Sequence, residues 1–139
     1  MNNNVEIEIS ENVNKKMLQA ILEAYEKIDY ENKKLALSTS DGIWMVKVSD
    51  IVRLEGDGNY TKIYFRNGNF LHISKTLKIF EALLVDYKFD RIHKSHLVNL
   101  HYIKRYYKND GSYVLMEDDE KIAVSKSKRE RLMLRLELL

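Results

Sequence analysis

The chain has 139 residues with no cysteine and no proline, and 23 lysines and arginines against 21 acidic residues give a formal net charge of +2. This length suits one domain with a hydrophobic core, and the lack of cysteine excludes disulfide scaffolds, zinc ribbons and thiol catalysis. No apolar run approaches the roughly 18 residues of a transmembrane helix. Residues 1–12 also lack the basic and apolar regions of a secretory signal. We therefore expect a cytoplasmic protein.

The small net charge hides an asymmetry between the two parts of the chain. Residues 1–59 hold 7 lysines and arginines against 11 acidic residues, whereas residues 60–139 hold 16 against 10. Because binding of an anionic partner depends on the local field rather than on the total charge, near-neutrality does not exclude nucleic acid.

The N-terminal region is expected to contain one amphipathic helix. Residues 5–9 alternate apolar and acidic side chains and are either a short strand or a tail. Residues 12–34 follow with apolar positions three and four residues apart, which predicts a helix with one apolar face. The seam of this face is Met17, Ile21, Ala24 and Ile28. Packing on the chain's own domain is the simpler interpretation of that seam, and contact with a second helix in a dimer is the alternative.

From residue 35 onward the pattern changes to short strands separated by turn residues. The Asn67-Gly68 dipeptide is a strong hairpin signal, because both residues accept a positive φ. A helical stripe of Leu77, Phe80, Leu83 and Leu84 interrupts the strands and predicts a helix over residues 76–86. The expected strands are residues 35–38, 43–48, 51–55, 59–66, 69–74, 92–93 (from a run that begins at Phe89), 96–99, 103–107, 112–116 and 121–124.

The C-terminus is expected to close with a helix. Residues 127–130 (SKRE) match the capping box, in which a serine and a glutamate satisfy free N–H groups of the first turn. Its buried face would be Leu132, Leu136 and Leu139, with Met133 beside them. The fold class is therefore α+β, mainly β, made of short antiparallel strands with an intervening helix and a helix at each end.

Several kinds of catalytic or ligand site can be set aside. His93 and His96 would share a helix face as metal ligands, but in this strand-like segment they should point to opposite faces, so we expect no metal site. The glycines of residues 55–59 lack the phosphate-loop and calcium-loop patterns and indicate a tight turn. No serine lies in a nucleophile elbow and no carboxylate pair has a defensible partner, so we expect neither an enzyme nor a cofactor. A ligand sensor built on Tyr60, Tyr64 and Tyr102 is the weakest alternative.

What remains is a set of basic and hydrogen-bonding residues at turns and strand ends. Lysine and arginine neutralise phosphates, and serine and asparagine side chains fix the register of a duplex. The first cluster is Asn59, Tyr60 and Lys62; the second is His93, Lys94 and Ser95; the third is Lys126, Ser127, Lys128, Arg129 and Arg131. Any single cluster could be a solvated surface, and composition alone does not show that the three share a face.

Four segments and Ile103 together resemble the LytTR DNA-binding domain. The most specific is FDRIHKSHLVNL at residues 89–100, which is followed by Ile103 and by IAVSKSKRERL at residues 122–132. Upstream, DIVRLEGDGNYTKIYF at residues 50–65 and SKTLKIFEALL at residues 74–84 fit the same order and spacing. The resemblance extends over residues 35–139, which would be the DNA-binding domain, with residues 1–34 as an acidic segment and a linker or dimer helix.

The resemblance implies an elongated arrangement of small antiparallel sheets whose loops, rather than a recognition helix, enter successive major grooves. It maps the three loops onto the three clusters, with Tyr60, Lys94 and Lys126 in the leading positions. The neighbouring residues that it implies are Asn59, Lys62, His93, Ser95, Ser127, Lys128 and Arg129. Arg91, His93, Val98 and Asn99 would hold the motif in shape or touch the DNA backbone.

Two features depart from the family pattern. The last loop often reads Ser-Arg and here reads Ser125-Lys126, which replaces a bidentate fork with a point charge. The usual receiver domain is also absent from this sequence. The resemblance thus implies a bacterial transcription regulator that binds repeated promoter DNA as a homodimer, either alone or as the output domain of a two-component response regulator with a receiver and a sensor kinase. A protein-interaction module that docks through the N-terminal helix is the alternative.

Overall fold

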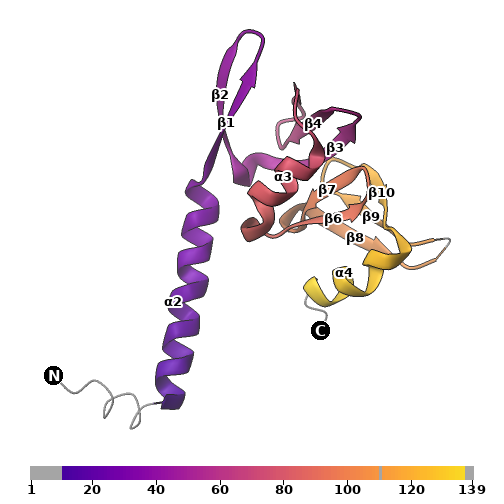
Figure 1. The fold of residues 1–139 in the computed structure, drawn as a ribbon. Helices are drawn as coiled ribbons and strands as arrows, with labels where there is room; N and C mark the ends of the chain where they lie inside the picture. Colours follow the sequence, from indigo (N-terminus) through magenta and orange to yellow (C-terminus); the bar gives the residue numbers. More distant parts are fainter. Residues whose placement is uncertain (1–10, 110, 137–139) are drawn as a thin grey trace.

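The computed structural model describes residues 11–109 and 111–136, so the strand or tail expected at residues 5–9 lies outside the described part. The described chain begins with α2 (Glu11–Asn32), which stands to one side of a β-rich body (Figure 1). The other helices are α3 (Leu77–Leu84) and α4 (Arg129–Arg135). The strands are β1 (Lys34–Thr39), β2 (Gly42–Lys47), β3 (Ile51–Asp57), β4 (Tyr60–Phe65), β5 (Phe70–Ile73), β6 (Phe89–His93), β7 (His96–Asn99), β8 (Ile103–Tyr107), β9 (Tyr113–Met116) and β10 (Lys121–Ala123).

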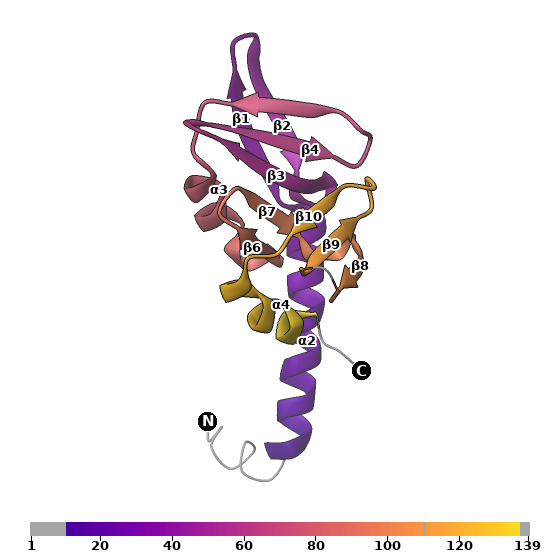
Figure 2. The ribbon, with the colours of Figure 1, turned by 90° about the vertical axis from the view of Figure 1, so that its right-hand side faces the viewer.

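These strands form three small antiparallel sheets. The central sheet has the order β5-β4-β3-β7-β6, a second sheet has the order β10-β9-β8, and β1 and β2 form a separate hairpin. In Figure 2 the central sheet crosses the upper part of the body, with the second sheet and α4 below it. The expected α+β fold of small antiparallel sheets with an intervening helix is confirmed, and each expected strand from β1 to β10 is present.

Two hydrophobic cores hold the body together. In the first, the central sheet packs on α3 and β1, with Leu54, Phe80 and Leu84 among its buried members. In the second, β6 and β7 pack against the three-stranded sheet and α4, with Ile92 and Leu132 among the buried members. Strands of the central sheet contribute to both cores, because alternate side chains point to opposite faces of a sheet.

Ion pairs join the second sheet and α4 to the central sheet. Arg53 on β3 is 5% exposed, and its Nε donates to an Asp118 carboxylate oxygen 2.8 Å away, in the turn between β9 and β10. Asp90 on β6 is 2% exposed and pairs with Arg131 and with Arg135 on α4, the latter at 3.3 Å. Both buried charges therefore have a partner of opposite sign, as burial requires.

The hairpin between β4 and β5 forms where it was expected, although the geometry of its turn differs. The Phe65 N–H donates to the Asn69 carbonyl at 2.9 Å, so the loop has three residues rather than two. Gly68 has a φ of 88°, and Asn67 is not among the described residues with positive φ. A three-residue loop that ends in a left-handed glycine needs only one positive φ, which explains the difference.

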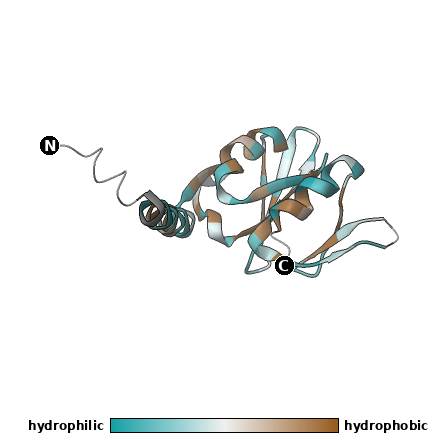
Figure 3. Cartoon of the chain, turned by 90° about the horizontal axis from the view of Figure 1, so that it is seen from below, coloured by the Kyte–Doolittle hydropathy of each residue, from teal (hydrophilic) through white to brown (hydrophobic). Residues whose placement is uncertain are grey.

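The interpretation that the seam of α2 packs on its own domain is wrong. Met17, Ile21 and Ile28 are 55%, 61% and 58% exposed, and Ala24 is exposed as well. Figure 3 looks along α2 and shows the helix beside the body rather than within it. The helix itself forms over Glu11–Asn32, close to the predicted range.

The other two helices also differ from expectation, α4 in its start and buried face and α3 in its buried stripe. The capping box does not form: Ser127 lies inside a 3-10 turn (Lys126–Lys128), α4 starts at Arg129, and no side chain caps it. A capping residue needs an extended backbone, which a residue within a helical turn lacks. On α4 only Leu132 is buried, while Leu136 and Met133 are half-buried and Leu139 lies outside the described residues. On α3, Leu83 is 51% exposed, so the buried stripe is Leu77, Phe80 and Leu84.

Candidate nucleic-acid interface

The three polar clusters meet at one end of the central sheet. Two backbone hydrogen bonds join them: the Gly56 N–H donates to the Ser95 carbonyl, and the Ser125 N–H donates to the Ile92 carbonyl, each at 2.8 Å. The first bond joins the end of β3, next to the β3–β4 turn, to the β6–β7 turn, and the second joins the segment after β10 to β6. In Figure 2 this end of the sheet lies to the left, where β5 passes into α3. We call it the loop end.

The first cluster surrounds the β3–β4 turn. Gly58 has a φ of 61° at the first position of a two-residue loop, where type II′ turns favour glycine. Asn59 is exposed in the second position. Tyr60 is 45% exposed and stacks on His72 of β5, with 4.8 Å between ring centroids. Lys62 lies on the same strand, with its ammonium 5.7 Å from the centre of the Phe70 ring.

The second cluster forms the β6–β7 turn at Lys94 and Ser95. The Arg91 guanidinium donates to the Lys94 carbonyl, 3.2 Å from Nε, and to the Glu81 carboxylate of α3 at 3.1 Å. The Ser95 N–H donates to Nδ1 of His93 at 3.1 Å. These contacts fix the backbone of the turn and leave the Lys94 side chain exposed. The arrangement presents one lysine on a rigid hairpin tip.

The expectation that His93 and His96 point to opposite faces is wrong. The two residues are paired across the hairpin and their ring centroids are 5.3 Å apart. The reason is the two-residue turn between them, which folds the chain back so that residues 93 and 96 are not on one continuous strand. Burial lowers the pKa of His96, an effect that the nearby His93 and Arg53 reinforce and Glu55 opposes. Within the described residues, no group of three or more His, Asp or Glu side chains could hold a metal ion.

The motif residues Val98 and Asn99 lie inside the body. Val98 is fully buried in the second core. Asn99 is also fully buried, and its side-chain amide donates to the Tyr30 hydroxyl and to the Ile51 carbonyl, each at 2.9 Å. Asn99 Oδ1 accepts from the His101 N–H at 3.0 Å. Asn99 therefore connects β7 to β3 and fastens the C-terminal end of α2 to the body.

The third cluster lies between β10 and α4. Lys126 and Ser127 are exposed, and Lys128 is half-buried. Arg129 is half-buried and its Nε donates to the Val124 carbonyl at 3.3 Å. Arg131 pairs with the buried Asp90, so its charge belongs to the packing of α4. The free cationic groups of this cluster are thus concentrated in its first residues.

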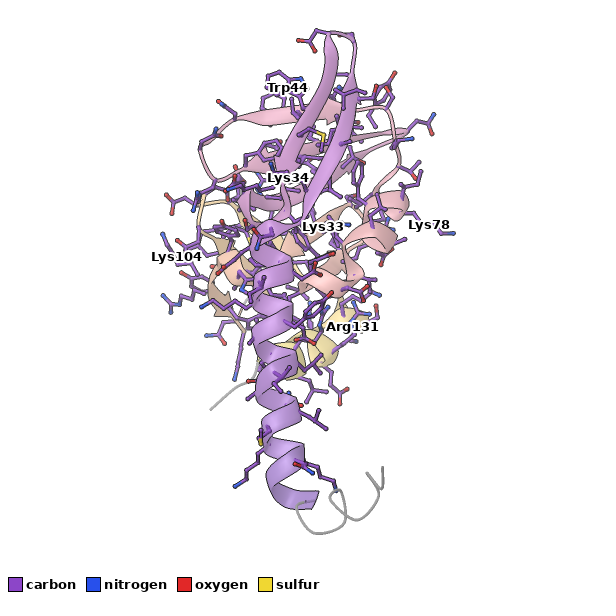
Figure 4. All side chains as sticks on the ribbon, turned by 90° about the vertical axis from the view of Figure 1, so that its left-hand side faces the viewer. Lys33, Lys34, Trp44, Lys78, Lys104 and Arg131 are labelled. Carbon is purple, nitrogen blue, oxygen red and sulfur yellow. The ribbon has the colours of Figure 1, made fainter. Side chains whose placement is uncertain are left out.

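Sequence reasoning missed the contribution of β5 and the start of α3 to the loop end. Thr61 pairs with Ile73, and its hydroxyl donates to the Lys75 carbonyl at 2.7 Å, which puts His72 and Lys75 beside the first cluster. The hairpin register set by Asn67-Gly68 could have indicated this neighbourhood. Figure 4 shows Lys78 of α3 on the opposite side of the body from Lys104 of β8.

The loop end combines exposed lysines, an aromatic ring and hydroxyl and amide groups on a rigid framework. Lysines contact phosphates or guanine edges, and small polar groups fix orientation, so this set of side chains suits a duplex groove. Acidic groups stand against the pattern: Asp57, whose carboxylate is 4.0 Å from the His72 imidazole, and Glu55, which is in register with Lys62 and His96. Of the three tyrosines weighed as a ligand site, Tyr64 lies under the Arg53 guanidinium and Tyr102 donates to the Ser49 carbonyl, so they engage in separate contacts.

A groove of about 800 Å³ lies elsewhere on the molecule, between β2 and the β4–β5 hairpin. Trp44, Met45 and Phe70 are among its lining residues. It contains none of the residues of the three clusters, so it is separate from the loop end. No helix of the described chain is long and apolar enough to cross a membrane.

Comparisons with known proteins identify similar domains. The family model for the LytTr DNA-binding domain matches residues 41–137. The heme-containing CO-sensing transcriptional regulator RcoM 1 of Paraburkholderia xenovorans (strain LB400) is 32% identical over 102 residues, which cover 71% of this chain and 38% of that protein. The sensory transduction protein LytT of Bacillus subtilis (strain 168) is 30% identical over 115 residues, covering 81% and 47% respectively.

A solved structure matches as well. It is the LytTr DNA-binding domain of a putative methyl-accepting/DNA response regulator from Bacillus cereus, with a TM-score of 0.65, 27% identity, and coverage of 77% of this chain and 99% of that one. The chain spans less than half the length of the two curated relatives described above.

Proposed function

Because the chain belongs to the LytTR DNA-binding domain family, we propose that it recognises a specific sequence of duplex DNA through its loop end and acts as the output part of a transcription regulator. The observation that carries this proposal is the pair of backbone hydrogen bonds that gather three polar turns at one end of the central sheet. Three rigid tips side by side can enter a duplex together, whereas scattered basic side chains would only coat a surface.

In this proposal the leading contacts come from Tyr60, Lys94 and Lys126, one from each turn. All three are exposed, and each sits at or beside the tip of its turn. Lysine reaches guanine O6 and N7 but lacks the fork of arginine, so we expect less discrimination from Lys126 than an arginine would give. The supporting phosphate contacts are assigned to Asn59, Lys62, His93, Ser95, Ser127, Lys128 and Arg129.

The proposal for the whole protein is that residues 35–139 bind DNA, while residues 1–34 link or pair two copies on a repeated promoter site. The relatives are longer than this chain, so a receiver domain or a sensor kinase belongs to the proposal as a further part of the system. A DNA partner also implies that the protein works in the cytoplasm and that this domain has no enzymatic activity of its own.

The first experiment measures binding to duplex DNA as a function of salt. The logarithm of the association constant should fall linearly with the logarithm of the salt concentration, with a slope of about −0.9 for each phosphate neutralised. A duplex selected from a random pool should bind more tightly than the unselected pool at every salt concentration. A protein-interaction module would instead show no salt-dependent DNA binding, and that result would reject the proposal.

The second experiment assigns the contacts. Lys94→Ala and Lys126→Ala should each weaken binding to the selected duplex by about 1–3 kcal/mol if the side chain touches a base. Lys104→Ala is the matched control, because Lys104 is an exposed lysine on the side of the body away from Lys78 (Figure 4). Equal effects at all three positions would indicate a general charge effect and would contradict the assigned loops.

A further inference from the structure

The helix α2 turns its polar side toward its own domain. Gln19, Glu23, Glu26 and Tyr30 line a cavity of about 540 Å³ between the helix and the body, opposite Tyr87 and other body residues. Of these, Tyr30 reaches the body most closely, through its contact with Asn99 and a ring stack on His101 at 4.3 Å. The side of α2 that faces the body is thus mostly charged and amide side chains around one tyrosine.

The apolar side of α2 faces solvent. Met17, Ile21, Tyr25 and Ile28 are 55% to 65% exposed. At 100° per residue these side chains lie on the side opposite to Gln19, Glu23 and Tyr30. An amphipathic helix that packs on its own domain has the reverse orientation, with its apolar stripe toward the core. A second surface is therefore needed to cover the apolar side of α2.

We propose that α2 pairs in antiparallel orientation with α2 of a second copy of this chain. The seam Met17, Ile21, Ala24 and Ile28 has the alternating four- and three-residue spacing of a coiled coil. When two seams run in opposite directions, Met17 lies opposite the partner's Ile28, and Ile21 lies opposite the partner's Ala24. A large side chain then meets a small one in the central layers. A parallel pair would instead put Ala24 opposite the partner's Ala24, so that this layer of the interface would contain only small side chains.

The charges on α2 favour the same orientation. Its N-terminal half, residues 11–22, carries Lys15, Lys16 and Glu11, which sum to a net charge of +1. Its C-terminal half carries four acidic residues and Lys27; the acidic ones are Glu23, Glu26, Asp29 and Glu31. Glu23 and Glu26 line the cavity on the body side, so they make no contact across the seam. Antiparallel pairing nevertheless places the positively charged half of one helix nearer the negatively charged half of the other, whereas parallel pairing aligns halves of like charge. Opposed helix dipoles add to this preference.

The arrangement of the loop end agrees with an antiparallel pair. In Figure 2 the loop end lies to the left and α2 lies behind the body, so the outward face of α2 and the loop end point in different directions. Figure 4 looks onto that outward face, with the body behind it. The two-fold axis of an antiparallel pair is perpendicular to both helices and leaves the two loop ends on the same side. A parallel pair would turn them to opposite sides.

The pairing itself depends on α2 alone, but its consequence for DNA depends on the proposed function. With the seam in register, the C-terminal ends of the two helices are about 28 Å apart along the axis, at about 1.5 Å per residue. One turn of duplex DNA measures about 34 Å. The pair therefore holds the two helix ends to which the DNA-binding domains are attached at a separation comparable to one helical turn.

The first test measures the mass of the full chain in solution without DNA, by sedimentation equilibrium. The wild-type chain should have twice the monomer mass of 16.5 kDa at micromolar concentration. Ile21→Lys should shift it to the monomer mass, while Leu134→Lys, at a 75% exposed position on α4, should leave the dimer unchanged. A monomeric wild-type chain, or an Ile21→Lys variant that stays dimeric, would overturn the proposal. Circular dichroism checks that each variant is folded.

The second test determines the orientation by cross-linking, which the lack of native cysteine makes simple. A mixture of Met17→Cys and Ile28→Cys chains should form a disulfide-linked heterodimer under mild oxidation. Each variant alone should not, because in an antiparallel pair two copies of residue 17 are about 16 Å apart and a disulfide needs Cα atoms within about 7 Å. Efficient self-linking of the Met17→Cys chain would show a parallel pair and reject the orientation.

The two tests separate this inference from the proposed function. If the chain binds no DNA but has the dimer mass and the mixed cross-link, the pairing stands and the proposed function fails. If Ile21→Lys is monomeric and still binds a single half-site as tightly as the wild type, both stand.

Discussion

The helices α2 and α3 have the same kind of sequence pattern and opposite environments. On α3 the residues Leu77, Phe80 and Leu84 are 4% exposed or less, whereas Met17, Ile21 and Ile28 of α2 are more than half exposed. Hydrophobic periodicity therefore shows that a helix has an apolar face, and it does not show what that face meets. The difference arises from tertiary structure: α3 lies against the central sheet, whereas α2 contacts the body through Tyr30 near its C-terminal end.

The largest difference between the two helices should appear in stability. Phe80→Ala removes a fully buried ring from the first core and should lower the free energy of unfolding by about 3–5 kcal/mol. Ile21→Ala on α2 should change it by no more than about 0.5 kcal/mol at a concentration where the chain is monomeric, because the side chain is exposed. Urea unfolding measures both variants. A comparable loss for the two would mean that the apolar face of α2 is covered within the monomer.

A smaller effect is expected where α2 is fastened to the body. Asn99→Ala leaves the Tyr30 hydroxyl and the Ile51 carbonyl without this partner and should cost about 1–3 kcal/mol. Tyr30→Phe removes one hydrogen bond and should cost about 0.5–1.5 kcal/mol. Hydrogen exchange provides the sharper measurement: amides in the last turns of α2 should exchange faster in both variants, while those of α3 keep their protection. Unchanged exchange in α2 would show that other contacts hold the helix.

The smallest expected effect is a dependence of stability on pH. Burial lowers the pKa of His96 and of His101 in the folded chain, so both histidines take up protons more readily when the chain is unfolded. Stability should be unaffected well above the ordinary histidine pKa of about 6.5, and should fall as the pH drops below it toward the lowered folded pKa values. His96→Gln should reduce the steepness of this fall without removing it. A slope identical to wild type would exclude His96 as a source.

Most of the fold could be predicted because its signals are local. The tight turn of residues 55–59, the Asn67-Gly68 dipeptide and the alternation of side chains located the strands to within a few residues. Where a local signal gave a wrong prediction, a different local structure forms at that position. Ser127 matched a capping sequence but lies within a 3-10 turn, and His93 and His96 were assigned to opposite faces by an alternation that does not continue through the turn between them.

The candidate site was only partly accessible from the sequence. The three clusters could be identified by residue type, but their meeting at one end depends on β3 pairing with both β4 and β7. That order brings together segments far apart in the chain, which no local pattern reveals. His72 and Lys75 were missed for a related reason, since they join the site through the register of the β4–β5 hairpin. The roles of individual DNA contacts remain predictions.

The hydrogen bonds that join the three turns are made by main-chain atoms: the Gly56 N–H to the Ser95 carbonyl, and the Ser125 N–H to the Ile92 carbonyl. The spacing between the turns therefore does not depend on the exposed side chains at their tips. Lys94 and Lys126 can be exchanged for other residues without disturbing the frame. A scaffold of this kind separates the evolution of a binding preference from the evolution of stability, so new preferences can arise by substitutions at a few tips.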